Sequence, residues 1–75
     1  MQIPVVDMLK TGQNICILRE RSGISVRELQ NLLGFATPQA FYKWQHGDSL
    51  PTVDNLAALS VIFAVPIDEI VAVSR

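Results

Sequence analysis

The sequence predicts a small all-α domain made of five short helices. Residues that start helices alternate with residues that end them at regular intervals along the chain. Between these positions the apolar residues recur every three or four places, which puts them on one face of a helix. The chain has 75 residues, 49% of them apolar, which suits one folded domain over 1–75 with a thin core.

The first two helices are expected on either side of a Ser-Gly pair. Residues 1–10 form an N-terminal segment, and the first helix runs from about Thr11 to Arg21, with Ile15 and Leu18 facing inward. The second begins at Ser25, which forms a capping box with Glu28. That helix carries three leucines and ends at a glycine suited to a left-handed cap: Leu29, Leu32, Leu33 and Gly34.

The third helix is expected after a cap at Thr37, with Pro38 in its first turn, where a missing N–H costs nothing. Phe41 and Trp44 are three residues apart and define its inward face, and Gly47 ends it. Trp44 has an alternative role as a stacking platform for a base, but its spacing favours the core.

The fourth helix is expected from a cap at Thr52 to Phe63, and Pro66 opens a fifth from Ile67 to about Val71. The inward stripe of the fourth comprises Val53, Leu56, Leu59 and Phe63. The helices at 25–33 and 37–45, joined by a tight glycine-containing turn, have the layout of a helix-turn-helix at about 25–46. In that layout the second helix enters the major groove of double-stranded DNA.

An ordered set of short motifs resembles the phage repressor/Cro-type family, also called the xenobiotic-response-element family. The segment Pro38–Trp44 is also similar to a subgroup of small bacterial regulators. The resemblance covers about Thr11 to Val71 and implies a compact five-helix repressor-like fold, sequence-specific operator binding and a homodimer. The motifs are Leu18-Arg19-Glu20, Gly23-Ile24-Ser25, Glu28-Leu29, Leu33-Gly34, Lys43-Trp44-Gln45-His46-Gly47, Leu50-Pro51 and Val65-Pro66-Ile67-Asp68-Glu69-Ile70.

Four positions depart from the family pattern. The turn between Gly34 and Phe41 is one residue longer than usual, and Gln30 replaces a small residue between the two helices, for which the longer turn makes room. Val26 replaces a polar residue that usually touches phosphate. Gln45 replaces a Glu that usually pairs with the arginine matched by Arg19, so a charge-assisted hydrogen bond replaces the ion pair.

The outward side of the third helix supplies the expected base contacts. Glutamine suits adenine, lysine suits guanine, and an alanine methyl suits the thymine methyl. The alternative is that this side of the helix is an ordinary solvent-exposed surface without a ligand. The expected base-reading residues are Gln39, Ala40, Tyr42 and Lys43.

Phosphate contacts are expected from donors near the ends of the same two helices. The serine and threonine that begin these two helices are also expected to act as helix caps. For the arginine the alternative is an exposed charge without a ligand, and for the single histidine it is a loop residue without a binding role. The expected phosphate-binding residues are Ser25, Arg27, Thr37, His46 and Ser49.

The charge distribution supports this placement although the net charge is −1. The middle of the chain attracts phosphate, and the C-terminal part does not. From Arg19 to Lys43 the four cations Arg19, Arg21, Arg27 and Lys43 outnumber the two anions Glu20 and Glu28. From Asp48 to Glu69 there are four anions and no cation: Asp48, Asp54, Asp68 and Glu69.

The residues argue against an enzyme, a cofactor or a metal site, since the chain has one His, one Cys and no phosphate-cradling glycine loop. The single thiol, the lack of a signal peptide and the short apolar runs indicate a cytoplasmic protein without a membrane span. Apolar residues at Met1–Val6, Cys16, Ile17 and Val71–Val73 favour a dimer seam over the alternative, a monomer in which they pack on each other and the N-terminal segment folds back as a lid. The alternative function is a protein-interaction module, such as an antitoxin-like partner, which the acidic balance and Val26 favour.

Overall fold

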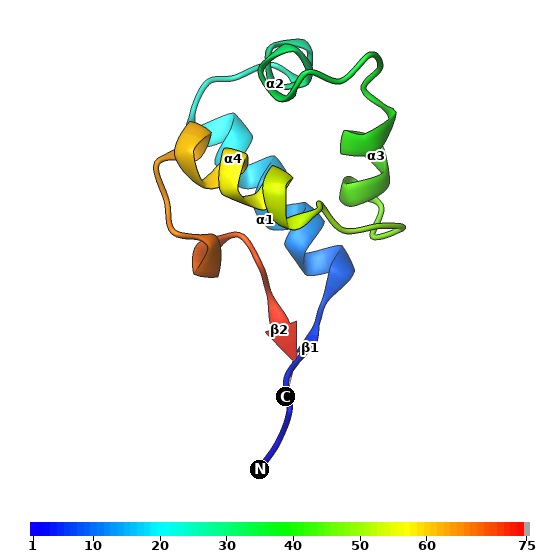
Figure 1. The fold of residues 1–75 in the computed structure, drawn as a ribbon, viewed down its shortest axis with the longest axis vertical. Helices are drawn as coiled ribbons and strands as arrows, with labels where there is room; N and C mark the ends of the chain where they lie inside the picture. Colours follow the sequence, from blue (N-terminus) through cyan, green and yellow to red (C-terminus); the bar gives the residue numbers. More distant parts are fainter. Residues whose placement is uncertain (75) are drawn as a thin grey trace.

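The computed structural model describes residues 1–74 and contains four α-helices, one 3₁₀ turn and a pair of two-residue strands (Figure 1). Within these residues, none of the helices combines the length and apolar character that crossing a membrane requires. The elements are β1 (Val5–Val6), α1 (Met8–Arg21), α2 (Val26–Leu33), α3 (Gln39–Gln45), α4 (Val53–Phe63), η1 (Ile67–Glu69) and β2 (Val73–Ser74).

The all-α class is confirmed, but the expected fifth helix is wrong. After Pro66 the chain forms only η1, closed by hydrogen bonds from Glu69 N to Pro66 O and from Ile70 N to Ile67 O. Ile70 is completely buried, and directly after it the chain turns to run beside α1. Because Ile70 is fixed in the core, the segment between Pro66 and Ile70 is long enough for only a single helical turn.

Helix α1 begins three residues before the expected Thr11. Asp7 is its cap, since Asp7 Oδ1 accepts a hydrogen bond from Lys10 N at 2.9 Å. Thr11 is instead fully buried inside the helix, and its Oγ1 accepts from Ala72 N at 2.9 Å. Asn14 Nδ2 donates to Ile70 O at 3.1 Å, so two side chains of α1 hold the C-terminal segment.

The two chain ends form a ribbon that projects from the helical body (Figure 1). Strands β1 and β2 are antiparallel, with Val5 opposite Ser74 and Val6 opposite Val73. The ribbon is continuous with the hydrogen bonds that hold the C-terminal segment against α1, because Asp7 N donates to Ala72 O at 2.8 Å. We call these bonds between α1 and the segment 70–72 the terminal tether. Each strand has only two residues, which is too short for an alternating pattern of apolar and polar residues to predict it from the sequence.

The expected caps of α2 and α4 are confirmed, and that of α3 is not. Ser25 and Glu28 form both bonds of the capping box, and Thr52 Oγ1 accepts from Asn55 N at 3.2 Å. In α3 the cap position is Pro38, which has no side-chain cap hydrogen bond, and Thr37 Oγ1 lies 3.4 Å from Gln39 N. Helix α3 therefore starts without a strong cap of its own.

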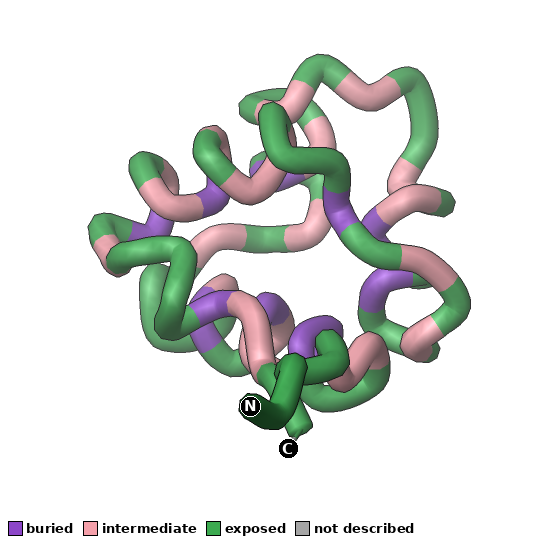
Figure 2. Tube along the Cα trace, turned by 60° about the horizontal axis from the view of Figure 1, so that its bottom comes forward, coloured by how far each residue is buried: buried purple, intermediate pink, exposed green. Residues whose placement is uncertain are grey.

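The hydrophobic core gathers residues from all four helices and from the segment after η1 (Figure 2). The inward positions expected for α1 and α3 are confirmed. Leu32 and Val53 were expected inside but are 61% and 78% exposed. Helix α2 instead faces the core with Val26, Leu29 and Leu33. The buried core residues are Ile15, Leu18, Leu29, Phe41, Trp44, Leu59, Phe63 and Ile70.

Three of the four helices within residues 1–74 end in the same reciprocal pair of hydrogen bonds. In each, a backbone carbonyl accepts from the N–H five residues later, as in a Schellman motif, and the side chain of the same residue donates to the carbonyl of that later residue. We call this arrangement a helix-end clamp. The pairs are Arg19 with Ile24, Gln30 with Phe35 and Ser60 with Val65.

Helices α1 and α3 come together through Gly12. A Cβ atom added to Gly12 would lie 1.8 Å from the carbonyl oxygen of Trp44, and Gly12 is buried. Only a hydrogen at this position allows the two backbones to meet. The approach places the end of α3 directly against α1, and α1 with α3 is the most extensive helix pairing of the fold.

We predict that Gly12→Ala destabilises the protein by about 3 kcal/mol, at the upper end of the cost of overpacking. The substitution would otherwise stabilise a helix by up to about 1 kcal/mol, so the sign of the change identifies the contact. Urea unfolding followed by the fluorescence of Trp44 measures it, with the exposed neighbour Gln13→Ala as control. Equal stability of both variants and the wild type would contradict the close approach.

Ala64 ends α4 in the left-handed conformation, with φ 55° and ψ 44°. An L-residue is strained there, whereas glycine is not. We predict that Ala64→Gly stabilises the protein by about 0.5–1 kcal/mol. Ala57→Gly, at an exposed position within α4, should destabilise by about 1 kcal/mol. Thermal unfolding measures both, and two changes of the same sign would contradict the strain at Ala64.

Candidate nucleic-acid interface

Helix α3 has one buried side and one polar exposed side. Phe41 and Trp44 are buried, while Gln39 and Lys43 are exposed. This exposed side contains three of the four expected base-reading residues, Gln39, Lys43 and Tyr42. Ala40 is half-buried and packs against the core, so only part of its methyl group remains accessible.

Tyr42 lies on the exposed side of α3 and is held in place by its neighbours. Its ring meets the Phe41 ring edge to face, with 5.7 Å between centroids and 70° between planes. The carbonyl of Tyr42 lies 2.7 Å from Nδ1 of His46, which fixes the imidazole at the end of the helix. Both side chains are exposed, so each retains a polar group toward solvent.

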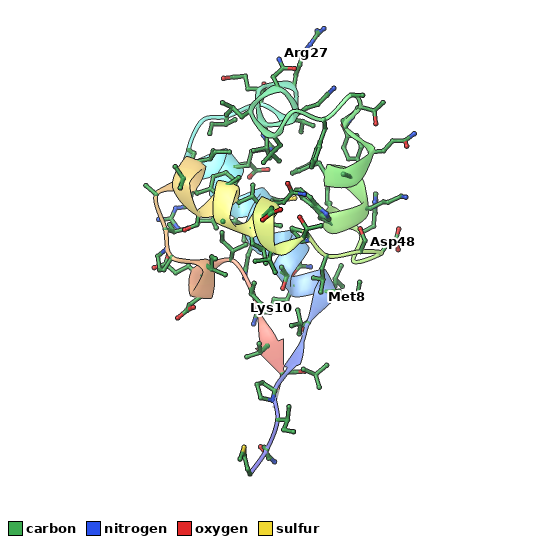
Figure 3. The ribbon with its side chains drawn as sticks, in the orientation of Figure 1. Met8, Lys10, Arg27 and Asp48 are labelled. Carbon is green, nitrogen blue, oxygen red and sulfur yellow. The ribbon has the colours of Figure 1, made fainter. Side chains whose placement is uncertain are left out.

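The start of α2 presents two of the expected phosphate-binding residues. Ser25 Oγ accepts from Glu28 N at 3.0 Å, so this hydroxyl already serves as the cap. Arg27 is exposed and points away from the body, at the opposite end from Lys10 (Figure 3). Val26 is half-buried against the core, which explains why an apolar residue stands where the family pattern has a polar one.

The remaining expected phosphate contacts flank α3. Thr37 is exposed just before the helix, and Ser49 is half-buried beyond it. Asp48, next to Ser49, exposes its carboxylate at the turn between α3 and α4 (Figure 3). A carboxylate at this place repels phosphate, which weakens the expectation for Ser49 and His46 relative to Arg27.

Arg19 is turned into the protein, where sequence reasoning expected a bond to Gln45. Its Nη1 donates to Ile24 O at 2.7 Å, its guanidinium lies 5.7 Å from the centre of the Phe41 ring, and its side chain is only 18% exposed. The exposed cations near α2 and α3 are therefore Arg21, Arg27 and Lys43.

The surroundings of the single cysteine do not favour a reactive thiolate. Cys16 is half-buried in a shallow groove beside Ile17 and Gln45, and burial raises the pKa of its thiol despite the nearby Arg19. A raised pKa keeps the thiol protonated and unreactive. Among residues 1–74, no three His, Cys, Asp or Glu side chains gather in a way that could hold a metal ion.

Two solved structures share this architecture. The restriction-modification controller protein C.AhdI from Aeromonas hydrophila superposes with a TM-score of 0.74 at 23% identity, covering 85% of this chain and 96% of its own. The DNA-binding domain of BldD gives a TM-score of 0.70 at 21% identity, covering 87% of this chain and 93% of its own. No protein-family model matches the chain, and a search of curated proteins found no relative.

The chain thus has the same fold as these two small domains. Helices α2 and α3 follow one another in the layout of a helix-turn-helix, and α1 packs against α3. The match to the controller protein C.AhdI extends over nearly the whole length of that protein.

Proposed function

We propose that this protein is a sequence-specific DNA-binding transcriptional regulator of the repressor type, which inserts α3 into the major groove. The observation that carries the proposal is the polar, exposed side of α3, whose opposite side is locked into the core by Phe41 and Trp44. Rigid support of this kind is what base recognition needs. The two structural neighbours, a restriction-modification controller protein and a DNA-binding domain, support it.

The roles follow from chemistry and exposure. Gln39 and Lys43 contact base edges, since amides pair with adenine and ammonium groups with guanine. Tyr42 contacts a base or the adjoining backbone, and the accessible part of the Ala40 methyl meets a thymine. Arg27 is the principal phosphate contact, with smaller contributions from Ser25, Thr37, His46 and Ser49. No catalysis is involved, and the site of action is cytoplasmic.

We predict that Gln39→Ala combined with Lys43→Ala abolishes discrimination between the best duplex and a scrambled one. Each bidentate base contact is worth about 1–3 kcal/mol, so the double variant should lose at least about thirtyfold in specific affinity. The reference duplex is selected from a random pool, and titrations by fluorescence anisotropy at two salt concentrations measure both affinities. Equal and negligible binding by wild type and variant would overturn the proposed function.

We predict a different effect for Arg27→Ala. Loss of a phosphate contact weakens binding to both duplexes equally and reduces the slope of log affinity against log salt by about 1. Lys10→Ala removes the same charge at the other end of the helical body and is the matched control (Figure 3). A loss confined to the specific duplex would show that Arg27 reads bases instead.

We further propose that the protein acts as a homodimer joined through the terminal ribbon. Val5 and Val73 of the ribbon are exposed, and a two-stranded sheet on its own is marginally stable in water. Pairing of the unpartnered edge with a second copy supplies the missing strands and covers the apolar side chains. A dimer also matches the two half-sites that proteins of this layout read.

We predict that Val5→Thr with Val73→Thr weakens self-association about tenfold, because the substitution keeps the branched shape while removing apolar surface. Sedimentation velocity over a range of concentrations measures it. Val61→Thr on α4 is the control, since Val61 is 81% exposed and lies on a different element. A larger effect of the control would place the interface on α4 instead.

One observation favours the interaction-module alternative. Val53 and Val61 lie eight residues apart on α4, and both are almost fully exposed, which leaves an apolar stripe beside the acidic C-terminal part. A partner protein that covers this stripe would give the chain a role without DNA. The DNA titration separates the two functions, because the alternative predicts no specific duplex at any salt concentration.

A further inference from the structure

We propose that Gln30 is the positioning residue that sets α3 for base recognition, through a helix-end clamp on the turn that precedes α3. This inference rests on the proposed function and extends it to a residue outside the proposed DNA contacts. Gln30 lies on α2, is partly buried and is not among the residues expected to touch bases or phosphates.

The clamp joins α2 to the turn by two hydrogen bonds. Phe35 N donates to Gln30 O at 3.0 Å, which is the usual bond of this helix end. Gln30 Nε2 donates to Phe35 O at 3.2 Å, and this second bond requires a side chain with a hydrogen-bond donor. A residue without a side-chain donor, such as alanine, would leave the partly buried Phe35 carbonyl without the bond.

The ring of Phe35 carries this restraint to α3. It meets the ring of Trp44 edge to face, with 5.8 Å between centroids and an interplanar angle of 68°. Such pairs have preferred geometry, so they fix orientation as well as distance. Trp44 is buried in the core, and Phe35 is therefore held by its backbone from α2 and by its ring from α3.

Helix α3 depends on this external restraint. It has only seven residues, Pro38 at its cap position makes no side-chain hydrogen bond, and the bond from Gln39 N to Thr37 Oγ1 is long at 3.4 Å, so the first turn is weakly held by its own residues. Only Ala36, Thr37 and Pro38 separate Phe35 from the first helical residue, Gln39. A displaced Phe35 therefore displaces Gln39, one of the proposed base contacts.

The structure supplies a matched control for this clamp. Ser60 forms the same pair of bonds with Val65 at the end of α4, outside the helix-turn-helix. Removal of either side-chain donor costs one partly buried hydrogen bond. Only the loss at Gln30 changes the turn before α3.

The test compares Gln30→Met, which keeps length and removes the donor, with Ser60→Ala in the full chain. We expect Gln30→Met to lose about tenfold in the ratio of affinities for the selected and the scrambled duplex, the size of a single imperfect base contact. Ser60→Ala should keep this ratio within about twofold. Iodide quenching of the fluorescence of Trp44, the only Trp of the chain, should change for Gln30→Met alone.

Each outcome has one meaning. A folded Gln30→Met protein that discriminates as well as wild type overturns the role of Gln30 and leaves the proposed function standing. A wild type that binds no duplex specifically overturns the proposed function and with it the part of Gln30 in base reading. The quenching measurement, which needs no DNA, then still decides whether Gln30 holds the turn.

Discussion

The close approach of α1 and α3 at Gly12 is the constraint on which the helix-turn-helix depends. The carbonyl of Trp44 occupies the space that any side chain at position 12 would need. Because the backbones meet, Trp44 is buried deeply and the end of α3 cannot shift along α1. The start of α3 is held separately through Phe35 and α2. A helix too short to be stable alone is thus restrained at both ends.

The helix-end clamps explain how so thin a core holds four helices in register. Each clamp links a helix to the segment that follows it, so the direction of the chain after the helix is defined locally. The side chain that donates differs, being a guanidinium, an amide or a hydroxyl. In α3 the equivalent residue is Lys43, whose side chain is exposed and available to a ligand. Three helices use this position for structure, and the fourth presents it to solvent.

The local features of the fold were predictable from the sequence because their causes are local. Capping at Ser25 and Thr52 and the inward faces of Phe41 and Trp44 depend on residues within one or two turns. The start of α1 has a local cause that the sequence analysis missed, the cap at Asp7. The burial of Thr11 was not predictable, because its side chain accepts a hydrogen bond from Ala72, sixty-one residues away.

The features of the candidate site likewise divide into those with a local cause, which were predictable, and those that depend on packing, which were not. The exposed side of α3 followed from the spacing of Phe41 and Trp44, and the structure places Gln39 and Lys43 there. The half-burial of Ala40 and the inward turn of Arg19 depend on how the helices pack, which spacing does not encode. The departure at Gln30 was visible in the sequence, but its hydrogen bond to Phe35 was not.

The terminal tether has a consequence for the order in which the protein folds and opens. The clamps join residues five apart, whereas Thr11 and Ala72 are sixty-one apart, and closing so large a loop costs more chain entropy. Contacts of this kind form late and open early, as a unit separate from the local ones. Because both strands of the ribbon are exposed, we expect the ribbon to open and close while the helices stay packed. Slow exchange of amide hydrogens would then be concentrated in α1 and α4, with the ribbon exchanging first.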